Sequence, residues 1–185
     1  GYPSDRIAYV PNGVGPEWLN PLSSRTLKAL RQQLEIEGRP VVGYVGSLSL
    51  ASHAVDLLLD AFRYLLARHP DALLLLVGGG EDYRAVQETA RQLGVFDACR
   101  FVGRVPASEV PAYYAISNVT VDPVHDDLAA RGRCPLKIVE SLAVGVPVVT
   151  GDVGDRREML AGGRAGMLVA PGDACLLYTS DAADE

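Results

Sequence analysis

Apolar residues in this chain occur in short unbroken runs, and longer segments with helical periodicity separate these runs. The two clearest runs are VVGYV at residues 41–45 and ALLLLV at residues 72–77. Runs of this length that are rich in valine and leucine indicate strands buried on both faces. Their alternation with helical segments predicts an α/β fold, in which a Rossmann-like parallel sheet carries helices on both faces.

The same pattern places the individual elements. Strands are expected at residues 7–10, 41–45, 72–77, 100–102, 118–122, 146–149 and 166–169. Helices are expected at residues 24–37, 55–68, 81–93, 109–115, 136–144 and 156–161. In such sheets the ligand crevice lies beyond the carboxyl ends of the strands, so we look for chemistry in the loops after residues 45, 77, 102 and 122.

One segment, CPLKIVESLAVGVPVVT at residues 134–150, joins a short helix to a buried strand. The helix is expected to pack through Leu136, Val139, Leu142 and Ala143 and to present Lys137, Glu140 and Ser141 on the opposite face. A helix that starts at this edge of a sheet directs unpaired N–H groups and the positive end of its dipole into the crevice. The segment therefore predicts a phosphate-binding helix start.

Six further motifs accompany this segment in a fixed order. They are PNGV at 11–14, VVGYVGSL at 41–48, VDLLLDAF at 55–62, LLLLVGGGED at 73–82, RFVGRVP at 100–106 and VTVDP at 119–123. Together they resemble the C-terminal, donor-binding domain of family 4 glycosyltransferases, which are retaining enzymes of GT-B fold. The resemblance implies a hexosyltransferase that takes a sugar from a nucleotide diphosphate and passes it to a hydroxyl acceptor, without a cofactor.

The resemblance also implies roles for single residues. Glu140 matches the glutamate that holds the nucleotide ribose. The backbone of three consecutive residues before and at the helix start is expected to cradle the phosphates, and the base is expected beside the 103–106 loop. The residues concerned are Cys134, Pro135 and Leu136 for the phosphates, and Arg104 and Val105 for the base. Alternatives without a ligand stay open for two of these residues. Arg104 could equally be an exposed surface charge, and Glu140 could form an ordinary surface pair with Lys137.

The chain departs from the family pattern at three positions. Ser47, the residue after Gly46, occupies the position at which the family has an arginine. Later in the same loop, Ser52 or His53 falls near the position of the family's lysine. Both family cations grip the donor pyrophosphate, and charge-assisted hydrogen bonds are the strong ones. A second family glutamate, which touches the transferred sugar, is replaced by Gly132. Lys137 or Arg131 is expected to supply cationic contacts instead, and His53 fits a solvated loop histidine equally well.

The loop rich in glycine, Gly78–Gly80, lacks the GxGxxG spacing of a dinucleotide site and is followed directly by Glu81 and Asp82. We interpret it as a tight turn from strand to helix in which the two acids complement the dipole of the following helix. Residues 123–133 contain acids, a histidine and arginines, but His125, Asp126 and Asp127 are adjacent in sequence, which suits a polar loop better than a coordination shell. No metal site is expected.

The ends of the chain differ from its body. Residues 175–185, CLLYTSDAADE, resemble the translation of a sequencing adapter, and without them the formal charge changes from −6 to −3, because three of the 23 acids are lost against 17 basic residues. We expect residues 1–22 to be the hinge from an absent N-terminal acceptor domain, residues 23–174 to bind a nucleotide sugar, and residues 175–185 to be a non-native tail. Alone, this fragment is expected to be inactive.

Composition narrows the remaining classes. An acidic balance gives no indication of nucleic-acid binding. No apolar run approaches the ~20 residues of a membrane span and no signal peptide is visible, so a cytoplasmic protein is expected, with peripheral docking of the full enzyme at the inner membrane face left open. Three cysteines without paired spacing argue against a disulfide framework or zinc. Two rival functions remain: a non-catalytic sugar-nucleotide-binding scaffold, and a nucleotide-sugar epimerase of the same architecture.

Overall fold

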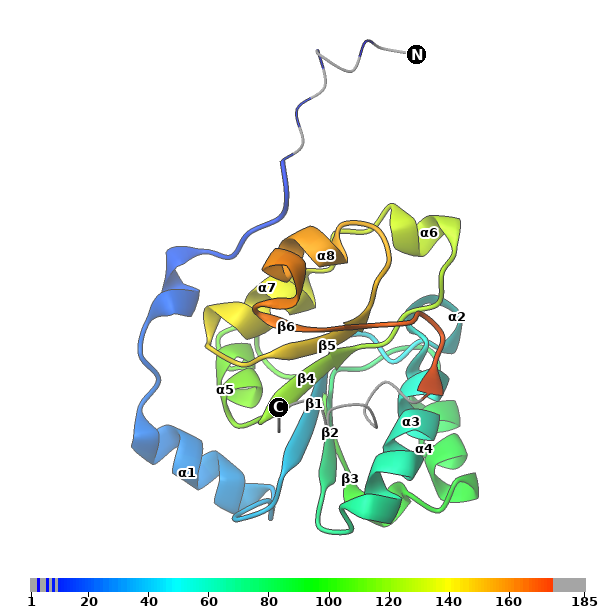
Figure 1. Ribbon diagram of the computed structural model, residues 1–185. Helices are drawn as coiled ribbons and strands as arrows, with labels where there is room; N and C mark the ends of the chain where they lie inside the picture. Colours follow the sequence, from blue (N-terminus) through cyan, green and yellow to red (C-terminus); the bar gives the residue numbers. More distant parts are fainter. Residues whose placement is uncertain (1–2, 4–5, 7, 9, 175–185) are drawn as a thin grey trace.

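A computed structural model describes residues 3, 6, 8 and 10–174 of the chain. Its centre is a six-stranded sheet in the order β3-β2-β1-β4-β5-β6, and every pair of neighbouring strands is parallel (Figure 1). The strands are β1 Val41–Val45, β2 Leu73–Val77, β3 Cys99–Gly103, β4 Val119–Asp122, β5 Val148–Gly151 and β6 Gly166–Val169. The predicted α/β class and Rossmann-like layout are confirmed.

Helices and short helical turns connect these strands. The helices are α1 Ser24–Gln33, α2 Leu50–His53, α3 Val55–Arg68, α4 Tyr83–Gln92, α5 Val110–Ala115, α6 Leu128–Arg131, α7 Leu136–Ala143 and α8 Arg156–Met159. Short 3-10 turns are η2 Pro16–Leu19, η3 Phe96–Ala98 and η4 Ala161–Gly163. Within the described part of the chain, no helix has the length and apolar character needed to cross a membrane.

Alternation along β2 divides the core between the two faces of the sheet. Leu74 and Leu76 pack with residues of α3 and α4, whereas Leu73, Leu75 and Val77 pack with residues of α1 and α5. Successive strand side chains point to opposite faces, so a strand that is apolar throughout needs a helix layer on each side. Figure 1 shows α3 and α4 together on one side of the sheet and α1, α5 and α7 on the other.

From residue 41 on, the predicted elements are found within two residues of their expected ends, and one earlier helix differs by more. The helix expected at 24–37 ends at Gln33 because Glu35 adopts a left-handed conformation (φ 56°) and the N–H of Ile36 donates to the carbonyl of Arg31 at 3.0 Å. This is a Schellman ending, and it places Ile36 in the core with no exposed surface. The short helices α2 and α6 were not predicted.

Two expectations concern the ends of the chain. Of the strand expected at residues 7–10, residues 7 and 9 lie outside the described residues, and Ala8 and Val10 belong to no strand. The expected tail at residues 175–185 also lies outside the described residues. The expected division into segments therefore stays a prediction.

The glycines after β2 are needed because the loop after β1 runs against them. Gly46 and Leu48 donate their N–H groups to the carbonyls of Val77 and Gly79, at 2.9 and 3.0 Å. A Cβ atom on Gly78 would lie 1.9 Å from the carbonyl oxygen of Gly46. Gly78 also has a φ of 136°, which favours glycine. The predicted turn from strand to helix is confirmed, and its shape depends on the loop packed beside it.

The acids after these glycines directly precede α4 and also contact the start of a second helix, α2. Asp82 accepts a hydrogen bond from the N–H of Leu50, the first residue of α2, at 2.8 Å. A hydrogen bond from Ser49 lowers the pKa of Glu81 below its usual value. Asp82 also occupies the N-cap position of α4, where the expected complement to the helix dipole stays a prediction, but its carboxylate hydrogen-bonds to α2 and not to α4.

The packed face of α7 also differs from expectation. Ile138 and Ser141 are fully buried, whereas Leu136 is 47% exposed. The hydroxyl of Ser141 donates to the carbonyl of Val146 at 2.9 Å and shares a 2.7 Å hydrogen bond with the hydroxyl of Thr120. A small polar residue is tolerated in the core when its hydrogen bonds are satisfied, and apolar periodicity cannot anticipate this.

Candidate functional site

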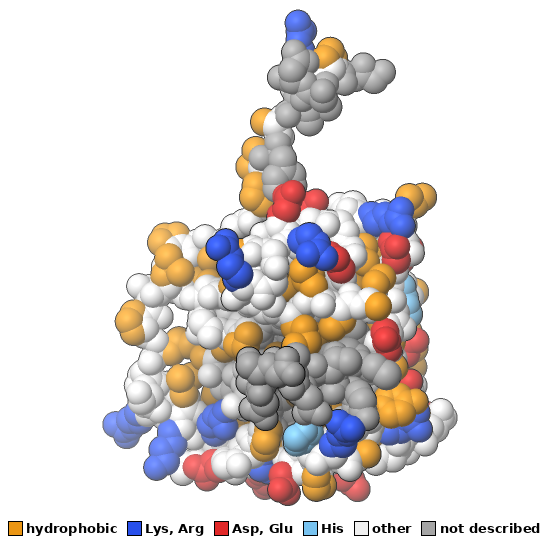
Figure 2. Space-filling view, in the orientation of Figure 1, with side chains coloured by type: hydrophobic (Ala, Val, Ile, Leu, Met, Phe, Trp, Pro, Cys, Tyr) orange, Lys and Arg blue, Asp and Glu red, His pale blue; other side chains and the backbone are white. Residues whose placement is uncertain are grey.

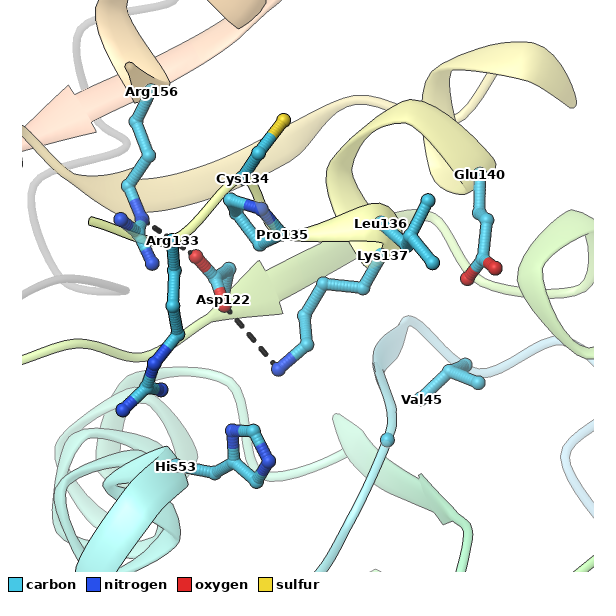
Figure 3. A pocket seen from close by; sticks show the side chains of 11 residues that line it. Val45, His53, Asp122, Arg133, Cys134, Pro135, Leu136, Lys137, Glu140 and Arg156 are labelled. Carbon is cyan, nitrogen blue, oxygen red and sulfur yellow. Dashed lines mark hydrogen bonds and ion pairs between the residues drawn. The ribbon is translucent and has the colours of Figure 1, made fainter. Parts of the chain in front are cut away.

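A cavity lies at the carboxyl ends of β1 and β4, where the connections from two neighbouring strands leave in opposite directions. Such a switch point creates a crevice in an open α/β sheet. The cavity has a volume of about 270 Å³ and its walls are Val45, Gly46, His53, Asp122, Arg133, Cys134, Pro135, Leu136, Lys137, Glu140 and Arg156 (Figure 3). Seven of the eleven residues predicted for the site therefore meet in one place: Gly46, His53, Cys134, Pro135, Leu136, Lys137 and Glu140.

A buried ion group forms the floor of this cavity. Asp122, the last residue of β4, is 3% exposed, and Arg156 from the start of α8 is 1% exposed. One carboxylate oxygen of Asp122 accepts from Arg156 Nε at 2.8 Å and from the hydroxyl of Thr150 at 3.1 Å. The other carboxylate oxygen lies 3.3 Å from Nζ of Lys137. Both oxygens are therefore engaged, and a single carboxylate joins two cations.

Electrostatics keep the Asp122 carboxylate ionised in spite of its burial. Desolvation is the largest influence on its pKa and by itself raises it. The charges of Lys137 and Arg156 and the hydrogen bonds they donate outweigh desolvation, so the pKa of Asp122 lies below its usual value. The group of two cations and one carboxylate consequently carries a net positive charge at neutral pH.

Lys137 projects from the first turn of α7 into the cavity (Figure 3). Its ammonium group lies 4.7 Å from the centre of the Tyr44 ring, a cation–π distance, in addition to its contact with Asp122. An ammonium has three N–H donors, so an anionic ligand in the cavity can be contacted without breaking the bond to Asp122. Burial raises the pKa of the Tyr44 hydroxyl, with a contribution from Asp122, and this hydroxyl stays neutral.

Glu140 lies at the other end of the cavity, one turn further along α7. Its carboxylate accepts a 2.7 Å hydrogen bond from the hydroxyl of Tyr114 in α5. Burial, followed by the charge of Glu140, raises the pKa of this tyrosine, which therefore acts as a donor. The ion pair of Lys137 is made with Asp122, so the alternative of a simple surface pair between Lys137 and Glu140 is not what the structure contains.

Two further groups, His53 and Arg133, face each other across the cavity. His53 ends α2, and burial, followed by the charges of Lys137 and Arg133, lowers its pKa below the usual value. The imidazole is therefore neutral at neutral pH and is half-buried rather than solvated. Arg133 donates from its guanidinium to the carbonyl of Ser52 on the opposite wall. Sequence reasoning did not select Arg133, although it immediately precedes the predicted phosphate-binding residues.

A second hollow of about 350 Å³ adjoins the cavity through two shared residues, and its walls are Val45, Gly46, Ser47, Val77, Gly78, Gly79, Arg104, Val105 and Val110. The predicted residues Ser47, Arg104 and Val105 lie here. Arg104 is exposed, and its side chain passes over Gly79, where an added Cβ would lie 2.9 Å from Nε. Ser47 accepts a 2.6 Å hydrogen bond through its carbonyl from the Tyr44 hydroxyl, which fixes the loop between the two hollows.

Arg131 is the predicted residue that the structure does not bring to either hollow. It is exposed on α6 and forms a two-pronged ion pair with Asp126, at 2.6 and 2.8 Å. Asp127 caps α6 by accepting from the N–H of Ala130 at 2.7 Å. Of these two nearby arginines, Arg133 and not Arg131 reaches the cavity, where Arg156 also lies.

The segment before α1 contacts the back of the site. Asn12 donates its side-chain amide to the carbonyl of Cys134 at 3.0 Å. Trp18 in η2 packs edge-on against Tyr114, with 6.0 Å between ring centres.

On the face of the described chain shown in Figure 2, acidic and basic side chains are interspersed, so no broad surface of one charge is visible there.

Known proteins resemble this chain in sequence and in architecture. Residues 39–179 match the family described as glycosyl transferases group 1. The GDP-mannose-dependent alpha-(1-6)-phosphatidylinositol monomannoside mannosyltransferase of Mycolicibacterium smegmatis is 32% identical over 180 residues, which are 96% of this chain and 47% of that protein. The crystal structure of Anabaena HepE in complex with UDP-glucose is 28% identical, with a TM-score of 0.76 over 91% of this chain and 45% of HepE.

The matches cover most of this chain but differ in how much of each relative they cover. The chain spans about half the length of the relatives named above. The crystal structure of the C-terminal domain of a group 1 glycosyl transferase, LpcC from Francisella tularensis, has the same fold, with a TM-score of 0.67 and 19% identity over 92% of this chain and 86% of that domain. With its parallel sheet, its cavity at the switch point and a family match over most of its length, this chain belongs to the group 1 glycosyl transferases.

Proposed function

We propose that this domain binds the nucleotide diphosphate sugar donor of a retaining glycosyltransferase of family 4, which transfers a hexose to a hydroxyl acceptor held by a preceding domain. The observation that carries the proposal is the polarity of the cavity. Lys137 and Arg133 stand at one end together with the start of α7, and the carboxylate of Glu140 stands at the other. A diphosphate and a ribose have this same polarity, one end anionic and the other rich in hydroxyl donors.

The cationic end suits a leaving diphosphate. The N–H groups at the start of α7 have no partner within the helix, and the helix dipole adds a positive potential there. When the bond between sugar and phosphate breaks, negative charge develops on the diphosphate, and preorganised donors that meet this charge lower the barrier. In this proposal Lys137, Arg133 and the backbone at Cys134–Leu136 perform leaving-group stabilisation, with no metal ion required.

The opposite end suits a ribose. A carboxylate accepts several hydrogen bonds, and Tyr114 occupies one oxygen of Glu140 and fixes its direction. The adjoining hollow beside Arg104 and Val105 then receives the base. The complex of HepE with UDP-glucose supports this arrangement by similarity, and the mannosyltransferase relative is dependent on GDP-mannose.

Calorimetric titration of the 185-residue chain with UDP, GDP, ADP, UDP-glucose and GDP-mannose tests donor binding. We expect saturable binding of one nucleotide series, weakened in Glu140→Gln by about 10- to 100-fold, since hydrogen bonds to a charged group contribute about 1.5–3 kcal/mol. The exposed Glu158 provides a matched control, and Glu158→Gln is expected to bind as the wild type does. A folded chain that binds none of the five compounds, or equal affinities in both variants, would refute donor binding at Glu140.

Transfer is tested on a protein in which this domain follows an acceptor-binding domain. Proton NMR of the product reports whether the anomeric configuration of the donor is retained, and inversion would contradict the retaining assignment. The uncharged residues Ser47, Ser52 and Gly132 favour one competitor, a scaffold that binds donor without transfer or hydrolysis. Formation of an altered nucleotide sugar without any acceptor would instead identify an epimerase.

A further inference from the structure

The loop after β1 contains no cation, although it forms one wall of the cavity. Residues 46–54 read GSLSLASHA, without lysine or arginine. The histidine of this loop, His53, has a pKa below its usual value, because of burial and then the neighbouring charges, and so contributes no positive charge at neutral pH. This wall consequently offers a diphosphate only neutral donors.

Arg133 brings a cation to this wall from the other side of the cavity. It belongs to the segment between α6 and α7, and its guanidinium reaches across to donate to the carbonyl of Ser52 in α2. Figure 3 shows the Arg133 side chain extending toward His53, on the same side of the cavity as the tip of Lys137. The positive charge of Arg133 therefore lies next to the loop at residues 46–54, which has no lysine or arginine of its own.

The guanidinium has donors to spare in this position. An arginine carries five N–H donors in a planar fork, and the bond to the Ser52 carbonyl uses one side of that fork. The side chain is half-buried and anchored at its tip, so little freedom is lost when an anion binds. A carbonyl neutralises no charge, in contrast to the carboxylate that holds Lys137. Of these two cations, Arg133 thus presents the less compensated charge.

We propose that Arg133 is a diphosphate-binding residue of this domain and supplies, from the opposite wall, the cationic contact that the loop after β1 lacks. The proposal rests on the proposed function, because it names a further residue of the same donor site. It predicts that the contribution of Arg133 depends on the number of phosphates in the ligand. A guanidinium that only straps α2 to the opposite wall would contribute equally whatever the ligand.

The test compares two arginines that lie two residues apart. Arg133→Ala and Arg131→Ala remove the same charge, but Arg131 is exposed and paired with Asp126 outside the cavity. Affinities for the nucleoside diphosphate, monophosphate and free nucleoside of the base that binds are measured by calorimetry on the 185-residue chain. For Arg133→Ala we expect a loss of about 10- to 100-fold for the diphosphate, a smaller loss for the monophosphate and none for the nucleoside.

Three controls make the outcome specific. Arg131→Ala is expected to change diphosphate affinity by less than about twofold, since it lies outside the cavity. Arg133→Lys keeps the charge without the fork and is expected to recover part of the affinity. Raising the salt concentration is expected to weaken diphosphate binding less in Arg133→Ala than in the wild type, because one screened contact is gone.

Distinct results overturn the proposal. Equal losses in Arg131→Ala and Arg133→Ala would show a general charge effect, and an equal loss for diphosphate and nucleoside would show a structural strap. Diphosphate binding that is unchanged in Arg133→Ala would refute this inference alone. A wild-type chain that is folded by circular dichroism and binds no nucleotide would refute the proposed function as well.

Discussion

Two neighbouring arginines at the start of α8 allow a direct measurement of what the buried ion group contributes to stability. Arg156 is 1% exposed and donates to Asp122 at 2.8 Å and to two backbone carbonyls at 3.1 and 3.2 Å. Arg157 is 60% exposed at its side chain and pairs with Asp152 on the surface. Replacing each arginine by methionine keeps most of the side-chain volume and removes only the charge and its donors.

The expected magnitudes differ widely. Removing one partner of a buried ion pair costs about 3–5 kcal/mol, because the other charge stays buried with less compensation. An exposed pair contributes about 0–1 kcal/mol. We therefore expect Arg156→Met to lower the free energy of unfolding by about 3–5 kcal/mol and Arg157→Met by less than about 1 kcal/mol. Thr150→Val removes one hydroxyl donor to Asp122 and is expected to lie between them, at about 1–2 kcal/mol.

Urea unfolding followed by circular dichroism measures all three variants at neutral pH. The series remains informative even if Arg156→Met is largely unfolded without urea. In that case the free energy of unfolding of Thr150→Val is compared with that of Arg157→Met. A cost for Arg156→Met no larger than that for Arg157→Met would refute the reasoning, since it would mean that Asp122 needs no buried partner.

The pH dependence of the same measurement has a definite sign. The folded-state pKa of Asp122 lies below its unfolded value, so this group stabilises the fold above the unfolded pKa of about 3.9 and the stabilisation is lost as pH falls through the folded pKa. Without Arg156, desolvation is opposed less strongly, and the folded pKa rises. Acid unfolding of Arg156→Met is therefore expected to begin at a higher pH than that of Arg157→Met, and coincident acid transitions would contradict this.

Three further outcomes are expected. Gly80→Ala should lower the free energy of unfolding by about 1–3 kcal/mol, because a Cβ there would lie 2.3 Å from a backbone carbonyl of the loop after β1; an unchanged urea midpoint would exclude that contact. Tyr114→Phe removes the hydrogen bond that fixes the Glu140 carboxylate, and it should weaken nucleotide binding about threefold to tenfold. Tyr113→Phe should leave the affinity unchanged, and calorimetry on both variants measures the difference. Burial raises the thiol pKa of Cys99 to about 12, so a thiol reagent at pH 8 should leave it unmodified in the folded chain, and its labelling detected by peptide mass mapping would contradict that.

The fold was largely predictable because its core strands are apolar on both faces. The run at β2 has no polar residue, and such runs separated by helical periods leave few alternatives to a parallel sheet. The end of α1 was less predictable. Nothing in local propensity announces that Glu35 turns left-handed, and the gain comes from burying Ile36 in a tertiary contact.

The site was predictable where backbone and sequence order define it, and less so where it depends on side-chain partners. The segment from Cys134 to Glu140 was found because it starts a helix after a strand. Asp122 and Arg156 were missed as a pair because they are 34 residues apart and meet only when β4 and β5 lie side by side. Arg131 was selected in place of Arg133, because only the turn of α6 decides which arginine faces inward.

The contact of Trp18 with Tyr114 has a consequence for communication within the polypeptide. Tyr114 holds Trp18 against one edge of its ring and donates through its hydroxyl to Glu140. A ligand that orders Glu140 therefore also favours the docked position of the segment around Trp18, and thermodynamic linkage requires the reverse effect to be equally large. If a nucleotide binds at Glu140 as proposed, its binding and the docking of the stretch that leads into the domain would therefore favour each other through Tyr114, the residue that contacts both sides.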